Sequence, residues 1–520
     1  MDLALDEALI AAQKKAAAAL RGWPIAAGRD LTDFEGFSLA GAFRFDLAIP
    51  LADLFRQAAL GRDPRYGGFL EDDGKKMFSP LPDFSLDWRR DDLKARALRA
   101  FCALARAVPR SKKAVLVLGS PSNRPLWPYW APRAEELGFG LDFALGRPPG
   151  LRNALASLRR GARVFDPAPT VLSADQTRRL ARMRAELTEL SALSAWRGLF
   201  HCDGHDFADE FTRSLFMPFL SRLEGMAAKC LAYEKALLLN LPSLVLLPED
   251  SSSDARLLLT LGKKHGVPVW LLEHGFPSAG YTTDEVLICG DLDADRILAW
   301  GETDKGNYRK LGVPEERLEV AGSPGFDRFL PAPPPRPLTQ VGGSAILVLG
   351  QLRIWSSTLY YEGCEERQFL ETAGLLRRLG AARILFKVHP GLARAEYFRG
   401  LAERLPPGCP IDFYKDENFH DVLAQADAAV GPASTAIFET MLRGKDYFLF
   451  HLSPGEIPPP LSTSNDFVAR DAAALESNLR ERRPVPRQAL REFCGIEGGE
   501  RPDHFSRRVC ERISAEISAR

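Results

Sequence analysis

The chain has 520 residues, too many for one hydrophobic core, and its length fits two large domains or three smaller ones. Hydrophobic residues make up 46% of the chain and charged residues 26%, as in ordinary globular proteins. The 68 basic and 68 acidic side chains cancel. The composition therefore excludes a protein drawn to nucleic acid or anionic lipid by its net charge.

The cysteines and the N-terminus predict a cytoplasmic protein. No C-x-x-C pair occurs among the eight cysteines, so we expect reduced thiols and neither a zinc site nor a disulfide framework. The first six residues lack the basic region of a signal peptide. No apolar run reaches the ~18 to 20 residues that a membrane-spanning helix requires. Peripheral contact with the inner face of the membrane stays open, and neither metal nor cofactor is expected.

The pattern of predicted strands and helices changes near residue 110. Residues 1–110 show few clear strands, and we expect an N-terminal elaboration of unclear fold. From 111 to 330, short apolar runs alternate with helical periodicity, which predicts a parallel sheet covered on both faces. The predicted strands are 114–118, 243–247, 267–272, 297–300 and 318–321, with helices near 133–137 and at 173–240, 255–265 and 302–311.

A proline-rich linker then separates a second series of the same kind. Five prolines in the seven residues 331–337 favour a stiff, extended connector, which we place at 331–340. A second domain is predicted at 341–490, followed by a C-terminal helical segment at 491–520. Its strands are expected at 345–349, 383–388, 411–414, 428–430 and 447–450, with helices at 365–379, 419–425 and 434–442. The predicted fold class is α/β, with two doubly wound Rossmann-like domains facing a cleft.

The strongest candidate site begins at Pro432, after a predicted strand. Ser434 or Thr435 falls at the start of a helix, where hydroxyls and unpaired backbone N–H groups bind phosphate. Glu439 lies one turn further on, where a carboxylate can hold ribose hydroxyls. An ordinary Ser/Thr helix cap is the alternative.

A second candidate is the strand end Lys387-Val388-His389-Pro390. Proline ends the strand and leaves the imidazole of His389 at the loop, where a protonated ring would donate to a leaving phosphate. The alternative is a turn histidine bonded to backbone. We also place Gly322 and Ser323, just before the linker, near the cleft as donor-binding residues.

The first domain offers three candidate bases at strand ends. His274 lies in Glu273-His274-Gly275, and Glu249 and Asp250 end the preceding strand. Any of the three could take a proton from an acceptor hydroxyl, although each also suits an ordinary turn or helix cap. The sequence lacks a Walker A motif, H-E-x-x-H, G-x-S-x-G and a G-x-G-x-x-G that opens a helix after a strand. These absences argue against NTPase, zinc protease, α/β-hydrolase and dinucleotide oxidoreductase functions.

Taken in order, these motifs resemble those of bacterial surface-polysaccharide transferases with the GT-B fold. That group includes capsule Kdo-transferase-like and CDP-glycerol glycerophosphotransferase-like proteins. The resemblance rests on the segments 273–275, 299–302, 311–313 and 321–327. Lys387 to Pro390 and Ser434-Thr435 are similar to motifs of CMP-sugar transferases, which implies that His389 contacts the nucleotide and the hydroxyls contact its phosphate. The resemblance covers about residues 240–450.

The hypothesis from the sequence is a glycosyltransferase that moves a sugar from a nucleotide-activated donor, preferably CMP-linked, to a glycan or lipid-linked acceptor in surface polysaccharide assembly. A CDP-glycerol-type polyol-phosphate transferase is the nearest alternative. A sugar-nucleotide epimerase shares the expected two-domain shape, although the N-terminal elaboration argues against it. A non-catalytic scaffold subunit of a glycan-assembly complex is the alternative from another class.

Overall fold

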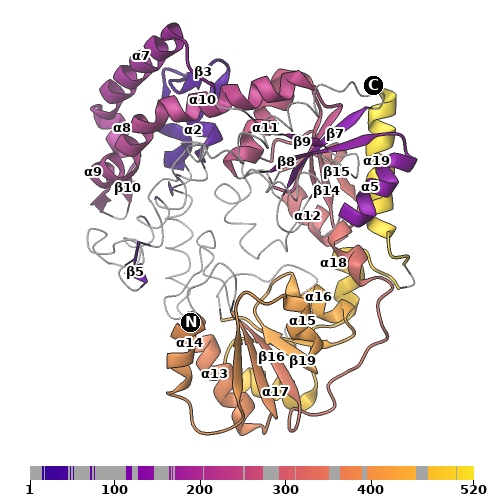
Figure 1. Cartoon of the computed structure of the whole chain (residues 1–520). Helices are drawn as coiled ribbons and strands as arrows, with labels where there is room; N and C mark the ends of the chain where they lie inside the picture. Colours follow the sequence, from indigo (N-terminus) through magenta and orange to yellow (C-terminus); the bar gives the residue numbers. More distant parts are fainter. Residues whose placement is uncertain are drawn as a thin grey trace, which may run out of the picture.

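The computed structural model describes, with short internal gaps, residues 15–55, 71–76, 113–119, 127–145, 163–272, 292–350, 364–388, 395–452 and 466–520 (Figure 1). Among the helices so described, none has the length and apolar character needed to cross a bilayer.

The first domain is built on a seven-stranded sheet whose neighbouring strands all run parallel. Its spatial order is β15-β14-β13-β12-β7-β8-β9, so the chain runs outward from β7 in one direction and then from β12 in the other. This is the doubly wound topology, with its switch point between β7 and β12. The strands are β7 (Ala114–Gly119), β8 (Gly140–Leu145), β9 (Arg163–Phe165), β12 (Leu244–Leu247), β13 (Val269–Leu272), β14 (Arg296–Ala299) and β15 (Leu318–Val320).

The second domain repeats this topology with six parallel strands in the order β18-β17-β16-β19-β20-β21. Its switch point lies between β16 and β19. The strands are β16 (Ala345–Leu349), β17 (Arg383–Lys387), β18 (Ile411–Tyr414), β19 (Ala428–Gly431), β20 (Asp446–Phe450) and β21 (Val468–Ala469). The predicted fold class of two doubly wound Rossmann-like α/β domains is confirmed.

Helices cover both faces of the second sheet, because alternate strand residues point to opposite faces. Ile346 and Val348 pack with α13 (Cys364–Arg378), α14 (Ala395–Ala402) and α17 (Ala472–Glu481). Leu347 and Leu349 pack on the other face with α15 (Phe419–Ala424) and α16 (Ala436–Leu442). Burial on both faces explains why these strands are continuously apolar.

The helices of the first domain differ in part from the prediction. The segment 173–240 is not one helical stretch, because the hairpin of β10 (His201–Cys202) and β11 (His205–Asp206) interrupts it, with Gly204 in the left-handed region at φ 81°. The sequence analysis did not predict strands β8 and β9 of the first sheet or β21 of the second. The helices are α5 (Trp127–Glu136), α7 (Ala174–Ser191), α8 (Ser194–Gly198), α9 (Ala208–Phe211), the π-helical turn η2 (Thr212–Phe216), α10 (Met217–Leu239), α11 (Ser253–Lys264), α12 (Glu302–Lys310), η4 (Glu315–Arg317) and η5 (Pro324–Phe329).

The described N-terminal residues form an elaboration on the first domain. Trp23 makes edge-to-face contacts with Phe216 and Phe219, 5.8 and 5.1 Å between ring centroids, and belongs to the core cluster that also contains α10 and α11. Its elements are β1 (Ile25–Ala26), β2 (Arg29–Asp30), β3 (Asp33–Phe34), β4 (Phe37–Ser38), α2 (Leu39–Ala42), β5 (Glu71–Asp72) and β6 (Lys75–Lys76).

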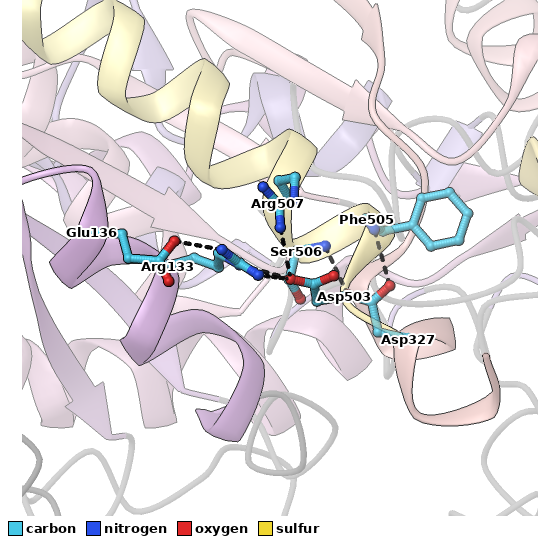
Figure 2. Close-up of polar contacts among 7 residues, drawn as sticks. All are labelled: Arg133, Glu136, Asp327, Asp503, Phe505, Ser506 and Arg507. Carbon is cyan, nitrogen blue, oxygen red and sulfur yellow. Dashed lines mark hydrogen bonds and ion pairs between the residues drawn. The ribbon is translucent and has the colours of Figure 1, made fainter. Parts of the chain in front are cut away.

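The C-terminal segment contains two helices, α18 (Gln488–Cys494) and α19 (His504–Ala519), and α19 returns to the first domain (Figure 1). Val509 and Ile513 of α19 are buried in one cluster with Val115 and Trp270 of the first sheet. Figure 2 shows the polar contacts at the start of α19, where Arg133 of α5 donates to Asp503 over 2.7 Å. The end of the chain therefore ties the second domain back to the first.

Candidate functional site

The candidate site lies at the carboxyl edge of the second sheet, at its switch point. Open α/β sheets bind ligands there, because the loops after the strands diverge and leave room. The loop of residues 432–435, here called the β19 loop, follows β19 and leads into α16. Ser434 and Thr435 are half-buried in it. Thr435 is the N-cap of α16, yet its hydroxyl makes no capping hydrogen bond, so the simple cap predicted as the alternative does not form there.

Buried side chains beneath the β19 loop determine its shape. A Cβ on Gly431 would lie 2.5 Å from Tyr447 Oη and 2.8 Å from Leu349 Cβ, so only glycine fits. Tyr447 Oη donates to the carbonyl oxygen of Pro432 over 2.6 Å. Burial raises the pKa of Tyr447 far above its ordinary value, although a hydrogen bond from Ser434 opposes the rise. Tyr447 therefore stays a protonated donor and anchors the loop.

His451 is a residue at this site that sequence reasoning missed. It follows β20 directly, and its Nδ1 accepts the backbone N–H of Ala433 over 3.4 Å. Its side chain is buried, and within the described part of the chain its Nε2 has no hydrogen-bond partner. Burial, and then the charge of Arg470, lower its pKa to about 3. The available signal was a histidine one residue past a predicted strand, the position that had drawn attention to His389.

Lys387 lies at the same edge, at the end of β17. Its side chain is buried, and Nζ donates to the carbonyl oxygens of Lys415 over 2.5 Å and Val388 over 3.3 Å. Burial lowers its pKa, and the nearby charges of Glu417 and Asp416 oppose that shift. The ammonium group is thus held by the carbonyl groups that directly follow β17 and β18. His389 and Pro390, predicted beside it, lie outside the described residues.

Glu439 forms an ion pair that the sequence did not indicate. Its Oε1 accepts from Nη2 of Arg328, in η5, over 2.9 Å, and its Oε2 lies 3.8 Å from Nε2 of His420. Burial raises the pKa of Glu439, although Arg328 opposes the shift. Burial, followed by the charges of Arg328 and Arg443, lowers the pKa of His420 to about 4, so that the ring is neutral at pH 7. The ribose contact predicted for Glu439 stays a prediction.

Gly322 and Ser323 lie beneath the C-terminal helix. Gly322 has φ +78°, and a Cβ there would lie 2.0 Å from Cδ1 of Phe505. Ser323 is buried beside it. Position 322 thus requires glycine because Phe505 of α19 packs directly against it, and the donor contact of both residues stays a prediction.

In the first domain, Glu249 follows β12 at the switch point of that sheet. Its carboxylate accepts from the backbone N–H of Ser252 over 2.8 Å and from the Ser252 hydroxyl over 2.5 Å. These bonds fix its orientation at the start of α11. Asp250 and His274, the other candidate bases, lie outside the described residues. Among the described side chains, no group of three or more His, Cys, Asp or Glu could hold a metal ion.

Together the described groups suit an anionic ligand. The β19 loop offers two hydroxyls, Lys387 and Arg470 carry positive charge at the same sheet edge, and a neutral histidine lies under the loop. Such groups bind phosphate oxygens through hydrogen bonds and charge.

No protein-family model and no curated protein sequence matches the chain. Solved structures do align with it. One, from Listeria monocytogenes and assigned as a UDP-N-acetylglucosamine 2-epimerase, is 10% identical with a TM-score of 0.47 and covers 79% of this chain and 98% of its own. The UDP-GlcNAc 2-epimerase from Neisseria meningitidis bound to UDP-GlcNAc is 12% identical with a TM-score of 0.42, covering 78% and 100%. A glycosyltransferase from Rickettsia africae is 10% identical with a TM-score of 0.40, covering 79% and 94%.

Proposed function

We propose that the chain is a glycosyltransferase of the GT-B type that transfers a sugar from a nucleotide-activated donor, preferably CMP-linked, to a glycan or lipid-linked acceptor in surface polysaccharide assembly. The observation that carries the proposal is the position of Ser434 and Thr435, on the loop after β19 at the switch point of the second sheet. The enzyme would act in the cytoplasm, with its acceptor reached at the inner face of the membrane.

In this scheme the second domain binds the donor. Ser434 and Thr435 hold the leaving phosphate, together with His389, while Lys387 adds positive charge at the same sheet edge. Glu439 accepts hydrogen bonds from the ribose hydroxyls. Hydrogen bonds and charge stabilise the negative charge that develops on the phosphate as the sugar departs.

The first domain supplies the base. Glu249, Asp250 or His274 takes the proton of the acceptor hydroxyl, whose oxygen forms a bond to the anomeric carbon. The bond from that carbon to the phosphate oxygen breaks, and its electron pair stays on the phosphate. Of the three candidates, Glu249 lies within the described residues, where its carboxylate accepts from the backbone N–H and the hydroxyl of Ser252 and is thereby oriented at the start of α11.

Nucleotide binding tests the donor site. We expect calorimetric titration with CMP, CDP, UDP and GDP to give binding of a cytidine nucleotide, weakened about tenfold or more in Ser434→Ala and in His389→Ala, since a hydrogen bond to a charged group contributes about 1.5–3 kcal/mol. Ser344→Ala is the matched control, because Ser344 precedes β16 at the opposite edge of the same sheet, where its hydroxyl donates to the Gln340 carbonyl. Absence of binding by every nucleotide would refute the proposal, and binding of UDP alone would remove the CMP preference.

Turnover assays on Glu249→Gln, Asp250→Asn and His274→Ala test the base. One of the three should lose most of its transfer rate, by the factor of about 10² to 10⁴ that general base catalysis contributes. Full activity in all three variants would reject the assignment. If the product from a CDP-glycerol donor carried the glycerol phosphate, the polyol-phosphate alternative would replace sugar transfer.

A further inference from the structure

His451 has one ring nitrogen that accepts a hydrogen bond, Nδ1, and one that has no hydrogen-bond partner among the described residues, Nε2. Its Nδ1 accepts the N–H of Ala433 in the β19 loop over 3.4 Å. His451 is 7% exposed, and its Nε2 is buried. The ring lies on the same side of β20 as Tyr447, which holds Pro432 of that loop.

The contacts decide which nitrogen carries the proton. Because Nδ1 accepts from a backbone N–H, the hydrogen of the neutral ring must lie on Nε2. Its pKa, lowered to about 3 by burial and by Arg470, keeps the ring neutral at physiological pH. Nε2 is therefore a buried N–H donor with no acceptor in the described part of the chain, and a buried donor left without an acceptor destabilises a protein.

The neighbouring strand brings a positive charge to the same place. Arg470 follows β21 directly, and its Nη1 donates to the backbone oxygen of His451 over 3.4 Å. β19, β20 and β21 are adjacent and parallel, with Gly431 opposite Leu449 and Phe450 opposite Ala469. Their carboxyl ends therefore align, so that the β19 loop, His451 and Arg470 form a row along one sheet edge.

We propose that His451 Nε2–H donates a hydrogen bond to a phosphate oxygen of the bound nucleotide, and that Arg470 supplies positive charge to the same phosphate group. The inference rests on the proposed function, because it requires a nucleotide phosphate on the β19 loop. It adds a binding residue from a strand end that none of the sequence motifs includes.

Two substitutions separate the ring nitrogens. His451→Asn places an amide oxygen near the Nδ1 position, so it keeps the acceptor for Ala433 and loses the Nε2 donor. His451→Gln places an amide N–H near the Nε2 position and loses the Nδ1 acceptor. We expect calorimetry to show CMP and CDP binding weakened about tenfold or more by His451→Asn and much less by His451→Gln. Binding of the phosphate-free nucleoside cytidine should not change in either variant.

Three controls make the result decisive. His265→Asn removes a histidine of the first domain that pairs with Glu234, and it should leave nucleotide binding unchanged. Circular dichroism and thermal unfolding establish that each variant is folded. In the wild type, the Nε2–H proton resonance of His451 should shift downfield on addition of CMP and not on addition of cytidine, because only CMP carries the phosphate acceptor.

The outcomes distinguish the inference from the function on which it rests. If the wild type binds no nucleotide, the proposed function fails first. If the wild type binds CMP and His451→Asn binds it equally well, the function stands and the inference is overturned. The reverse pattern, with His451→Gln weakened and His451→Asn unaffected, would make His451 a support for the loop alone and would likewise overturn it.

Discussion

At the scale of the residue, Gly431 shows how little space the candidate site leaves beneath its loop. The position lies between Leu349 of β16 and Tyr447 of β20, the strands on either side of β19. The missing side chain lets Tyr447 reach the carbonyl group of Pro432, and that contact determines where Ser434 lies. A glycine at a strand end is thus required here by close packing, and no unusual backbone angle is involved.

Gly431→Ala should therefore destabilise the second domain by about 1–3 kcal/mol, the usual cost of overpacking a buried site. Nucleotide affinity should fall as well, since the loop must move. Gly400→Ala is the matched control in the same domain, because Gly400 is inside α14 with nothing within 4 Å of an added Cβ. It should leave stability unchanged or raise it by up to about 1 kcal/mol. Urea unfolding measures both, and equal stability of the two variants would contradict this account of Gly431.

At the scale of the element, α19 begins with a cap that another segment supplies. Asp503, its N-cap residue, makes no capping bond to the helix and instead pairs with Arg133. The first-turn N–H groups of Phe505 and Ser506 are bound by Asp327 of η5, over 2.9 and 2.7 Å (Figure 2). The start of the helix is therefore tied to the segment that leads into the linker.

The contribution of the Asp327 cap to the free energy of unfolding depends on pH. Burial raises the pKa of Asp327 from 3.8 to about 6, although its hydrogen bonds from Ser506 and Phe505 oppose the rise. Its contribution to the free energy of unfolding is full below pH ~4 and is lost as the pH rises through ~6. Asp327→Asn cannot titrate, so the stability gap between wild type and variant should widen by about 2 kcal/mol from pH 7 to pH 4.

Asp503→Asn is the control for Asp327. Burial alone would raise the pKa of Asp503, but the hydrogen bond and charge of Arg133 lower it overall. Its contribution is present at neutral pH and is lost on acidification, so the gap for this variant should narrow toward low pH. Denaturant unfolding at several pH values measures both gaps. A gap for Asp327→Asn that is constant with pH would show that the carboxyl group does not titrate in this range.

At the scale of the whole molecule, residues 324–330 connect the two domains. Phe326 and Phe329 follow the last strand of the first sheet, yet they are buried in a core cluster of the second domain with Trp300 and Phe438. Trp300 and Phe326 pack edge to face at 5.0 Å between ring centroids. Arg328 adds the ion pair with Glu439 of α16. The segment therefore couples the orientation of the domains to the helix that follows the β19 loop.

A double-mutant cycle tests this coupling. Arg328→Met should destabilise the protein by about 1–3 kcal/mol, because it removes the guanidinium group from the largely buried Glu439 carboxylate. Combined with Glu439→Gln it should cost less than the sum of the two single changes. Calorimetric unfolding of Arg328→Met should also separate the transitions of the two domains. Arg399→Met, which breaks an exposed pair within α14, is the control and should change nothing measurable. Additive effects in the cycle would show that the pair does not couple the domains.

The sequence by itself determined the alternation of central strands and helices in both domains, the absence of helix and strand in residues 331–340 and the two-domain fold class. These follow from local rules, since a strand buried on both faces must be apolar throughout and proline stops regular structure. Ser434, Lys387 and Glu249 were chosen as candidate site residues in the same way, as polar residues that follow or end predicted strands, and their roles stay predictions.

Only the tertiary structure decided which strand ends are neighbours and which side chains meet across them. The pairing of Glu439 with Arg328, the return of α19 to the first domain and the position of His451 under the β19 loop join residues separated by 111, 178 and 18 positions. Such contacts depend on the strand order and on how the domains pack, which local periodicity does not contain. Strand β8, with its buried Asp142, and the three-residue β9 were missed because they lack the continuous apolar runs of the central strands.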